Sequence, residues 1–331
     1  MSCWRDPTVV PPSSGLHTHT IILLHDWNST GQILSRQLLE ETNIRTRLPT
    51  VKFVFPTAPI RPLSGYRGVC EEDWFDAARF ANSNIQLDLQ RMGLQTTRRD
   101  LWNLIDEEAA IAVDANANAN ANATTGVPGG RYTACNGYRR VIVGGEGQGC
   151  AAAIAAVLAG NPGNSEARLG AFISLSGWLP FDDQMYDLLN GPTEDTRSMV
   201  EILRSDMLGL LGRKTGTSQE TGPAAVYTSQ YPTPMFIGHE STGWKEHLDR
   251  VERMEILLKY AFPANVTAKA YGRSGAYGWT TSSGGPSKID CVVDFLKDKV
   301  GIETWPRVMR MEEREFQDLS NKMDLFSFDR S

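Results

Sequence analysis

The sequence predicts an α/β fold with a mainly parallel central sheet and helices on both faces. Short apolar runs rich in Val, Ile and Phe alternate with segments of helical periodicity along the chain, and this alternation is the pattern of βα units. The chain has 331 residues, of which 41% are hydrophobic and 22% are charged. It is therefore long enough to bury the large core that such a sheet needs.

The predicted elements follow one another in the order that this fold requires. In the first helix, Ile33 and the leucines that follow it share one face, and Ser29 or Thr30 is the expected N-cap. We predict strands at residues 20–24, 52–55, 140–143, 171–175, 235–237 and 266–271, and helices at residues 31–41, 87–113, 148–159, 251–260 and 288–299.

One domain over residues 16–300 accounts for these elements. It is interrupted at residues 114–130 by a low-complexity insertion that begins with alternating Ala and Asn. A two-residue repeat of this kind has no apolar face to bury, so we expect a solvated insertion between a helix and the next strand. Residues 301–331 form a C-terminal extension of mixed charge.

Composition excludes several classes of function. The 33 Lys and Arg against 39 Asp and Glu give a net charge of −6, which argues against a surface for nucleic acid or anionic lipid. No apolar run suits a signal peptide or a membrane span, so we expect no membrane insertion.

The five cysteines are scattered, which indicates reduced thiols in a cytoplasmic protein. No metal-ligand spacing or dinucleotide-binding loop occurs, and we expect no cofactor.

The most informative stretch joins an apolar strand to an alanine-rich helix. Gly145, Glu146, Gly147, Gln148 and Gly149 stand at this junction. A strand that runs through glycines into a helix is the setting of the nucleophile elbow, G-x-S-x-G, whose sharp turn exposes a catalytic serine. Here glycine stands at the position of the nucleophile.

Further motifs carry a resemblance to a known family. They are THTIILLH at residues 18–25, FVFPTAP at 53–59, DWFD at 73–76, GAFISLSGWLP at 170–180 and TPMFIGH at 233–239. With these motifs the chain resembles the acyl-protein thioesterase, lysophospholipase and carboxylesterase family of α/β-hydrolases, especially its branch in filamentous fungi. The resemblance covers about residues 16–300 and implies an α/β-hydrolase fold.

The resemblance also implies where a Ser-Asp-His triad would stand. The serine falls at Gly147, the aspartate at Gly243 and the histidine at Ala276, so all three functional side chains are replaced. Triad chemistry needs a nucleophile, a base and a group that orients the base. Independently of any alignment, the sequence has no G-x-S-x-G motif and no histidine after residue 247.

The oxyanion site depends on backbone donors, which survive changes of side chain. By family position the two N–H groups come from Trp27 and Gln148. Asp26 stands where the family usually has the glycine of His-Gly, and a carboxylate there would repel a developing oxyanion.

Several side chains are candidates for lining a pocket at this site. The candidates are His25, Asp26, Trp74, Glu146, Trp178 and Trp244. The tryptophans either line an acyl-sized pocket or pack over the sheet edge, and the sequence favours neither. His25 is expected to make a structural hydrogen bond to neighbouring loops, and Cys150 is expected to pack in the core.

Three functions remain open at this stage. The first is a catalytically impaired family member that binds an acyl or ester-like ligand or a partner protein. The second is an active hydrolase of carboxylic esters or acyl thioesters that uses a displaced constellation of Asp26, Glu146 and His239. The third is a fold-only remnant of gene duplication with no selected activity. Core motifs do not separate these hypotheses, because they report packing rather than use.

Overall fold

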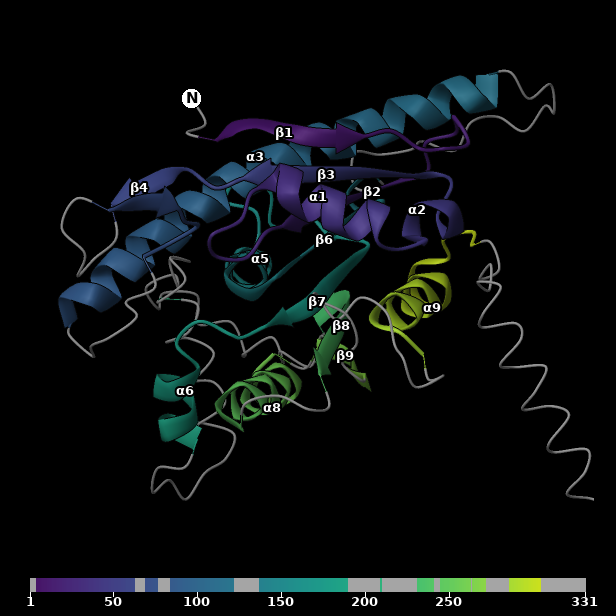
Figure 1. Ribbon diagram of the computed structural model, residues 1–331. Helices are drawn as coiled ribbons and strands as arrows, with labels where there is room; N and C mark the ends of the chain where they lie inside the picture. Colours follow the sequence, from purple (N-terminus) through teal and green to yellow (C-terminus); the bar gives the residue numbers. More distant parts are fainter. Residues whose placement is uncertain are drawn as a thin grey trace, which may run out of the picture.

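The computed structural model describes residues 4–62, 69–76, 84–121, 137–189, 209, 231–240, 245–262, 264–271 and 286–304. Its centre is a seven-stranded sheet in the order β1-β3-β2-β6-β7-β8-β9 (Figure 1). The strands are β1 (Arg5–Val10), β2 (His19–Leu24), β3 (Val51–Thr57), β6 (Val141–Glu146), β7 (Ala171–Gly177), β8 (Tyr231–Glu240) and β9 (Ala264–Tyr271). Only β1 is antiparallel to its neighbour, β3. The predicted mainly parallel sheet is therefore confirmed.

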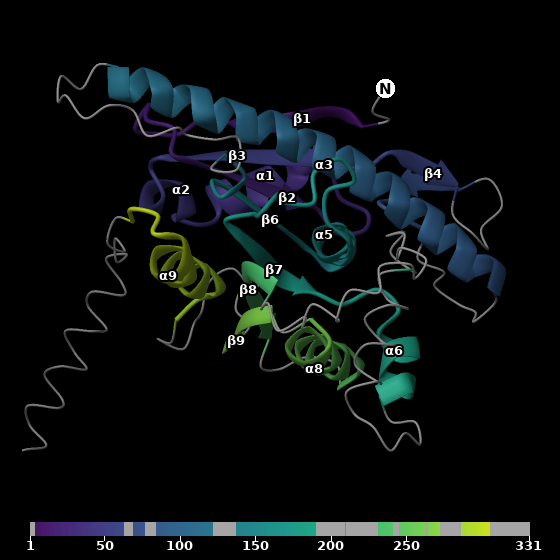
Figure 2. The same cartoon turned by 180° about the vertical axis from the view of Figure 1, so that it is seen from behind.

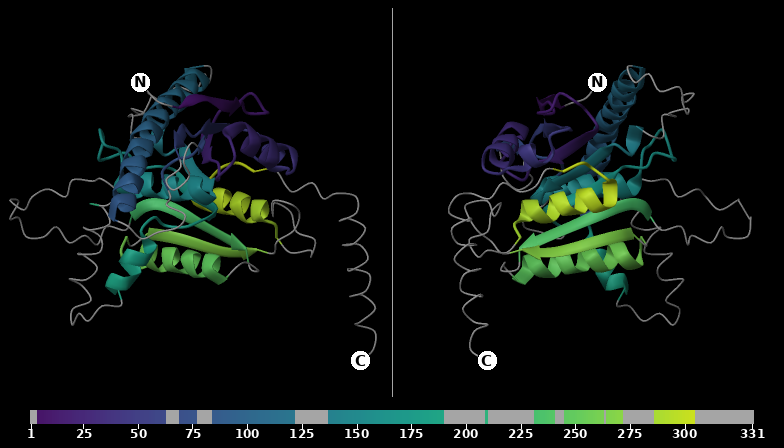
Figure 3. Two further views of the ribbon diagram at one scale, coloured as in Figure 1. Left: turned by 60° about the vertical axis from the view of Figure 1, so that its left-hand side comes forward. Right: turned by 90° about the vertical axis from the view of Figure 1, so that its right-hand side faces the viewer.

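Helices cover both faces of this sheet (Figures 2 and 3). One face carries α3 (Asn84–Ala121), α5 (Gly147–Ala159) and α8 (Lys245–Tyr260), and the other carries α1 (Gly31–Glu40), α2 (Ile44–Arg47) and α9 (Lys288–Val300). A further helix, α6 (Asp182–Leu189), packs beside α8. Among the described residues, no helix is long and apolar enough to cross a lipid bilayer.

Each face has its own apolar core, because successive strand residues point to opposite sides of the sheet. In β2, Ile22 and Leu24 pack toward α5, whereas Ile21 and Leu23 pack toward α1 and α9. All side chains of α5 are buried. Its alanines let α3 approach closely enough for the indole N–H of Trp102 to donate to the carbonyl of Ala156 at 2.9 Å.

The six predicted strands and five predicted helices are all present. Thr30 is the N-cap of α1, and its hydroxyl accepts from the N–H of Ile33. The sequence pattern did not predict β1, α2, α6 or the small hairpin of β4 (Ile60–Pro62) and β5 (Cys70–Glu72). These elements are short or lie at an edge, and two of the strands contain prolines, so they lack the periodicity on which the predictions rest.

The first part of the predicted Ala-Asn insertion is helical. Helix α3 runs past the expected end at residue 113 and continues to Ala121, so the first part of the repeat is helical. Alanine is the strongest helix former, which favours continuation of a helix that is already nucleated. Residues 122–130 lie outside the described residues, as does the extension beyond residue 304.

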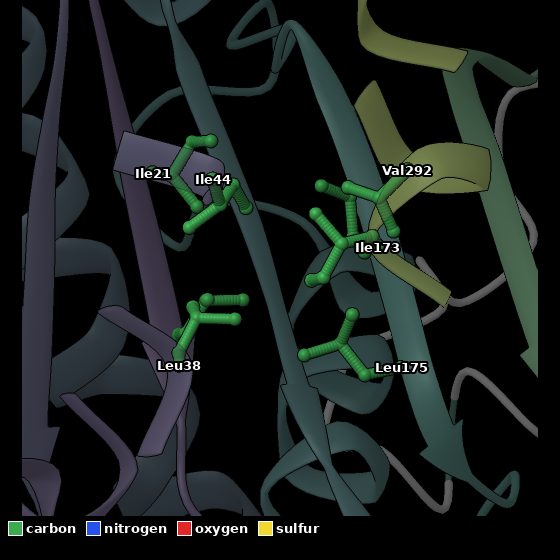
Figure 4. A pocket seen from close by; sticks show the side chains of 8 residues that line it. Ile21, Leu38, Ile44, Ile173, Leu175 and Val292 are labelled. Carbon is green, nitrogen blue, oxygen red and sulfur yellow. The ribbon is translucent and has the colours of Figure 1, made fainter. Parts of the chain in front are cut away.

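A small cavity lies in the core on the side of α1, α2 and α9 (Figure 4). Its wall is formed by Ile21, Leu23, Leu38, Ile44, Ile173, Leu175, Ile289 and Val292. These side chains are all aliphatic and offer no polar group to orient a ligand. The cavity is therefore a packing feature of this core.

A buried ion pair joins the beginning of α9 to α2. The guanidinium of Arg47 donates to the Asp290 carboxylate at 2.5 Å, and the two side chains are 8% and 11% exposed. Asp290 also belongs to the capping box that starts α9 at Ser287. The pair therefore fixes the start of α9 against a segment more than two hundred residues earlier in the chain.

We expect Asp290→Asn to lower the free energy of unfolding by about 3 kcal/mol, because it leaves the buried Arg47 charge without its main partner. Asp294→Asn is the matched control. Asp294 lies 3.9 Å from the same guanidinium but is 69% exposed, so its loss should cost less than about 1 kcal/mol. Urea denaturation of both variants measures the difference, and equal losses would contradict this assignment.

Candidate functional site

The turn between β6 and α5 has the geometry of a nucleophile elbow. Gly147 adopts a positive φ of 52°, a conformation that side chains disfavour and that the sharp strand-to-helix turn requires. The flanking glycines are also required. A Cβ at Gly145 would lie 2.7 Å from the carbonyl oxygen of Leu24, and one at Gly149 would overlap the carbonyls of Leu24 and His25. The elbow thus lies against the end of β2 with no room for side chains.

Asp26 fills the space beside this turn. A Cβ built on Gly147 would overlap Cγ and both oxygens of the Asp26 carboxylate. The same carboxylate accepts a hydrogen bond from the backbone N–H of Gln148 at 2.8 Å. Asp26 therefore lies where a side chain at residue 147 would begin, and it engages the N–H that the resemblance assigns to the oxyanion site.

The side chain of Gln148 ties the elbow to the segment around Trp74. Its Oε1 accepts from the backbone N–H of Trp74 at 3.1 Å, and its Nε2 donates to the carbonyl of Phe75 at 2.8 Å. The side chain is fully buried, so both bonds are needed to satisfy its amide. Trp74 is also fully buried, and its indole N–H donates to the carbonyl of His25 at 2.8 Å.

His25 makes the structural hydrogen bonds that were predicted for it. Its Nε2 accepts from the N–H of Ala58 at 3.1 Å, so the ring proton is on Nδ1, which donates to the carbonyl of Asp26 at 2.7 Å. Burial lowers the pKa of His25 to about 4, although the hydrogen bond to Asp26 and the charge of Glu72 oppose this shift. With both nitrogens engaged, His25 holds the loop in place and is not placed to act as a base.

Glu146 points toward the start of α9. Its carboxylate lies 3.6 Å from the ammonium of Lys288, whose side chain is only 1% exposed. The same ammonium lies 5.3 Å from the centre of the Tyr271 ring. A buried lysine needs such partners, so Glu146 has a structural role as the counter-charge of Lys288.

The three groups of the displaced constellation come from three different strands or the loops after them. His239 lies within β8, opposite Ala270 of β9, whereas Asp26 follows β2 and Glu146 ends β6. Strands β2 and β8 are separated by β6 and β7. The Asp26 carboxylate itself lies beside Gly147, at the end of β6, and β7 separates β6 from the strand that carries His239. A role of His239 as a base therefore stays a prediction.

Two tryptophans lie at the same edge of the sheet as the elbow. The rings of Trp27, after β2, and Trp178, after β7, are 5.4 Å apart. The guanidinium of Arg250 lies 4.6 Å from the centre of the Trp178 ring and donates to the buried carboxylate of Asp182. Trp178 is 8% exposed, and Trp27 is only partly buried. The pair thus combines packing with a partly accessible apolar surface.

Cys150 packs in the core as predicted. Its thiol is fully buried and donates to the hydroxyl of Ser174 at 3.1 Å. Burial raises the pKa of this thiol to about 12, against the weaker effect of the Ser174 hydrogen bond. A thiol in this state is a poor nucleophile.

Other predicted site residues stay untested. Gly243, Trp244 and Ala276 lie outside the described residues. The assignment of the Trp27 N–H to the oxyanion site also stays a prediction. Among the residues that the structure describes, no group of three or more His, Cys, Asp or Glu side chains could hold a metal ion.

Two contacts of the site were missed from the sequence. These are the overlap of Asp26 with the space at Gly147 and the pairing of Glu146 with Lys288. The signal for the first contact was the pair of departures from the residues usual in the family, an acid at position 26 and a glycine at position 147. Nothing in the sequence near Lys288 indicated the second.

Comparison with known proteins identifies related chains. A sequence model of the family described as phospholipase/carboxylesterase matches residues 5–200, more than half of the chain. Acyl-protein thioesterase 1 from Yarrowia lipolytica is 30% identical over 190 residues, which cover 57% of this chain and 70% of that protein. Acyl-protein thioesterase 1 from Gibberella zeae is 25% identical over 255 residues, which cover 76% and 95%.

A solved structure shows the same fold. The crystal structure of Zea mays acyl-protein thioesterase 2 aligns with a TM-score of 0.51 and 22% sequence identity, over 89% of this chain and 99% of that chain. At this identity the likeness concerns the fold alone.

The buried His25 predicts a loss of stability in mild acid. Its pKa is about 4 in the folded protein and about 6.5 in the unfolded chain. The unfolded chain therefore binds the proton first, and stability falls as the pH drops from about 6.5 to 4. His25→Gln keeps a donor and an acceptor but does not titrate. We expect the stability advantage of the parent over this variant to shrink by about 3 kcal/mol between pH 7.5 and pH 4.

Urea denaturation of the parent and of His25→Gln at several pH values measures this change. His19, whose pKa burial also lowers to about 4, adds the same trend to both proteins and cancels in the difference. A difference that stays constant with pH would refute the role assigned to His25.

Proposed function

The chain belongs to the phospholipase/carboxylesterase family, and we propose that it binds an acyl or ester-like ligand without hydrolysing it. The observation that carries this proposal is the position of Asp26. Its carboxylate lies in the space beside Gly147 and accepts the hydrogen bond from the Gln148 N–H. A carbonyl that undergoes attack needs a nucleophile on one side and a free oxyanion donor on the other.

The remaining groups of the site support the absence of hydrolysis. His25 has both ring nitrogens in hydrogen bonds to the backbone, and Cys150 is buried with a raised pKa. His239 lies on β8, and β7 separates this strand from the elbow at the end of β6. We propose that the displaced constellation provides no base at the elbow.

A binding role agrees with what the site keeps. The glycine elbow, the buried amide of Gln148 and the tryptophans at the same edge of the sheet fix the backbone at the junction of β6 and α5, where the resemblance places an acyl site. The partly exposed ring of Trp27 suits an alkyl chain. Cys70, Cys150 and Cys291 form no disulfide, which favours the cytoplasm as the proposed location.

The test is hydrolysis of a short-chain aryl ester and a palmitoyl thioester by the purified protein. We expect no turnover by the parent. A variant that carries Gly147→Ser, Gly243→Asp and Ala276→His should stay inactive, because Asp26 still obstructs the serine. Addition of Asp26→Gly should raise turnover by about 10²–10³-fold over that triple variant, the typical effect of regaining one oxyanion donor.

Turnover by the parent would refute the proposal. In that case, the turnover of an Asp26→Asn variant shows whether the Asp26 charge takes part in hydrolysis, because asparagine keeps the size of the side chain and removes the carboxylate. If the triple variant is as active as the variant with Asp26→Gly added, Asp26 is not the obstruction.

A further inference from the structure

We propose that Asp26 is an intramolecular occupant of the oxyanion site and that a ligand carbonyl or carboxylate binds there only in exchange for it. Asp26 and Gly147 then form a dependent pair, in which the carboxylate is tolerated because residue 147 has no side chain. The inference rests on the proposed function in one respect, that this site binds a ligand of the acyl type.

The Asp26 carboxylate and a side chain at residue 147 would occupy the same volume. An ideal Cβ there overlaps three atoms of the Asp26 carboxyl group. Real Cβ atoms do not approach other heavy atoms so closely, so either the carboxylate or the elbow must move when residue 147 has a side chain. The positive φ at Gly147 adds a strain for non-glycine residues that is independent of Asp26.

The hydrogen bond from the Gln148 N–H to the Asp26 carboxylate explains why a ligand must compete with Asp26. The Gln148 N–H lies in the first turn of α5, where unpaired backbone donors and the helix dipole favour an anion. Asp26 supplies that anion at 2.8 Å. A ligand carboxylate is the same kind of acceptor, so its binding free energy gains little when it takes the place of Asp26. The negative charge of Asp26 also repels the ligand as long as Asp26 stays near the site.

The backbone of Asp26 is held in place, so its carboxylate is not a freely moving surface group. Its carbonyl accepts from the buried ring of His25. The ring of the next residue, Trp27, packs against Trp178. Asn28 then takes a positive φ of 51°, which ends the extended path of the chain. Exchange therefore requires rotation of the Asp26 side chain rather than movement of the loop.

A double-mutant cycle on folding stability tests the steric competition between Asp26 and residue 147. Gly147→Ala, Asp26→Gly and the double variant are compared with the parent by urea denaturation. We expect Gly147→Ala to shift the folding equilibrium about 30-fold further toward the unfolded state in the parent than in the Asp26→Gly background, a coupling of roughly 2 kcal/mol. Additive effects of the two substitutions would overturn the dependent pair.

Gly160→Ala is the matched control for this cycle. Gly160 ends α5 with a positive φ of 73°, and a Cβ there would meet nothing within 4 Å. The Gly160→Ala substitution therefore introduces backbone strain at a positive φ without any contact to Asp26. Its effect should be the same with and without Asp26→Gly, and equal coupling of Gly147→Ala and Gly160→Ala to Asp26 would refute the steric argument.

Binding of octanoate tests the exchange. Isothermal titration calorimetry should give at least about tenfold tighter binding to Asp26→Gly than to the parent, since removal of the carboxylate frees a charge-assisted hydrogen bond. Glu166→Gln is the control for net charge, because Glu166 is exposed in the loop after α5, at the opposite edge of the sheet. It should bind as the parent does. Equal affinity of Asp26→Gly and the parent, including binding by neither, would overturn the exchange.

Ester hydrolysis and the double-mutant cycle distinguish failure of the proposed function from failure of the dependent pair. Ester hydrolysis by the parent refutes the proposed function and leaves the coupling between residues 26 and 147 unaffected. Additive effects of Gly147→Ala and Asp26→Gly on folding stability refute the dependent pair, and this result leaves the proposed lack of ester hydrolysis unaffected.

Discussion

The turn from β6 into α5 passes so close to the end of β2 that glycine is required at two of its positions. Gly145 and Gly149 face the carbonyls of Leu24 and His25 at distances that exclude a Cβ. This contact determines where α5 begins and where the Gln148 N–H points. It also brings the residue after His25 to the start of α5, so that Asp26 and Gly147 compete for one volume. The shape of the site therefore follows from the packing of backbone on backbone.

The supports of this turn are polar and buried, and they hold neutral groups in fixed orientations. His25 is locked by Ala58 and by the carbonyl of Asp26, and Gln148 is locked by Trp74 and Phe75. Buried polar groups without partners are costly, so such a network specifies one geometry. The chain keeps this scaffold although Gly147 carries no side chain that could react.

Each of the two carboxylates that flank the elbow has its own partner. Asp26 interacts with the N-terminus of α5, and Glu146 interacts with Lys288 at the N-terminus of α9. Although the two acids flank the same turn, β6 carries Glu146 toward α9 while the loop after β2 carries Asp26 toward α5. Each of the two carboxylates is therefore engaged with a partner from a different helix.

The sequence by itself determined the alternation of strands and helices, an N-cap at Ser29 or Thr30 and the glycine elbow, because periodicity, capping and steric demands act over a few neighbouring residues. The edge strand β1 and the continuation of α3 to Ala121 were missed, since local patterns there are weak or ambiguous. Only the tertiary structure decided that the Asp26 carboxylate lies beside Gly147 and that Glu146 pairs with Lys288. Such contacts join residues more than a hundred positions apart, and they depend on strand order and on the paths of loops, which no local pattern specifies.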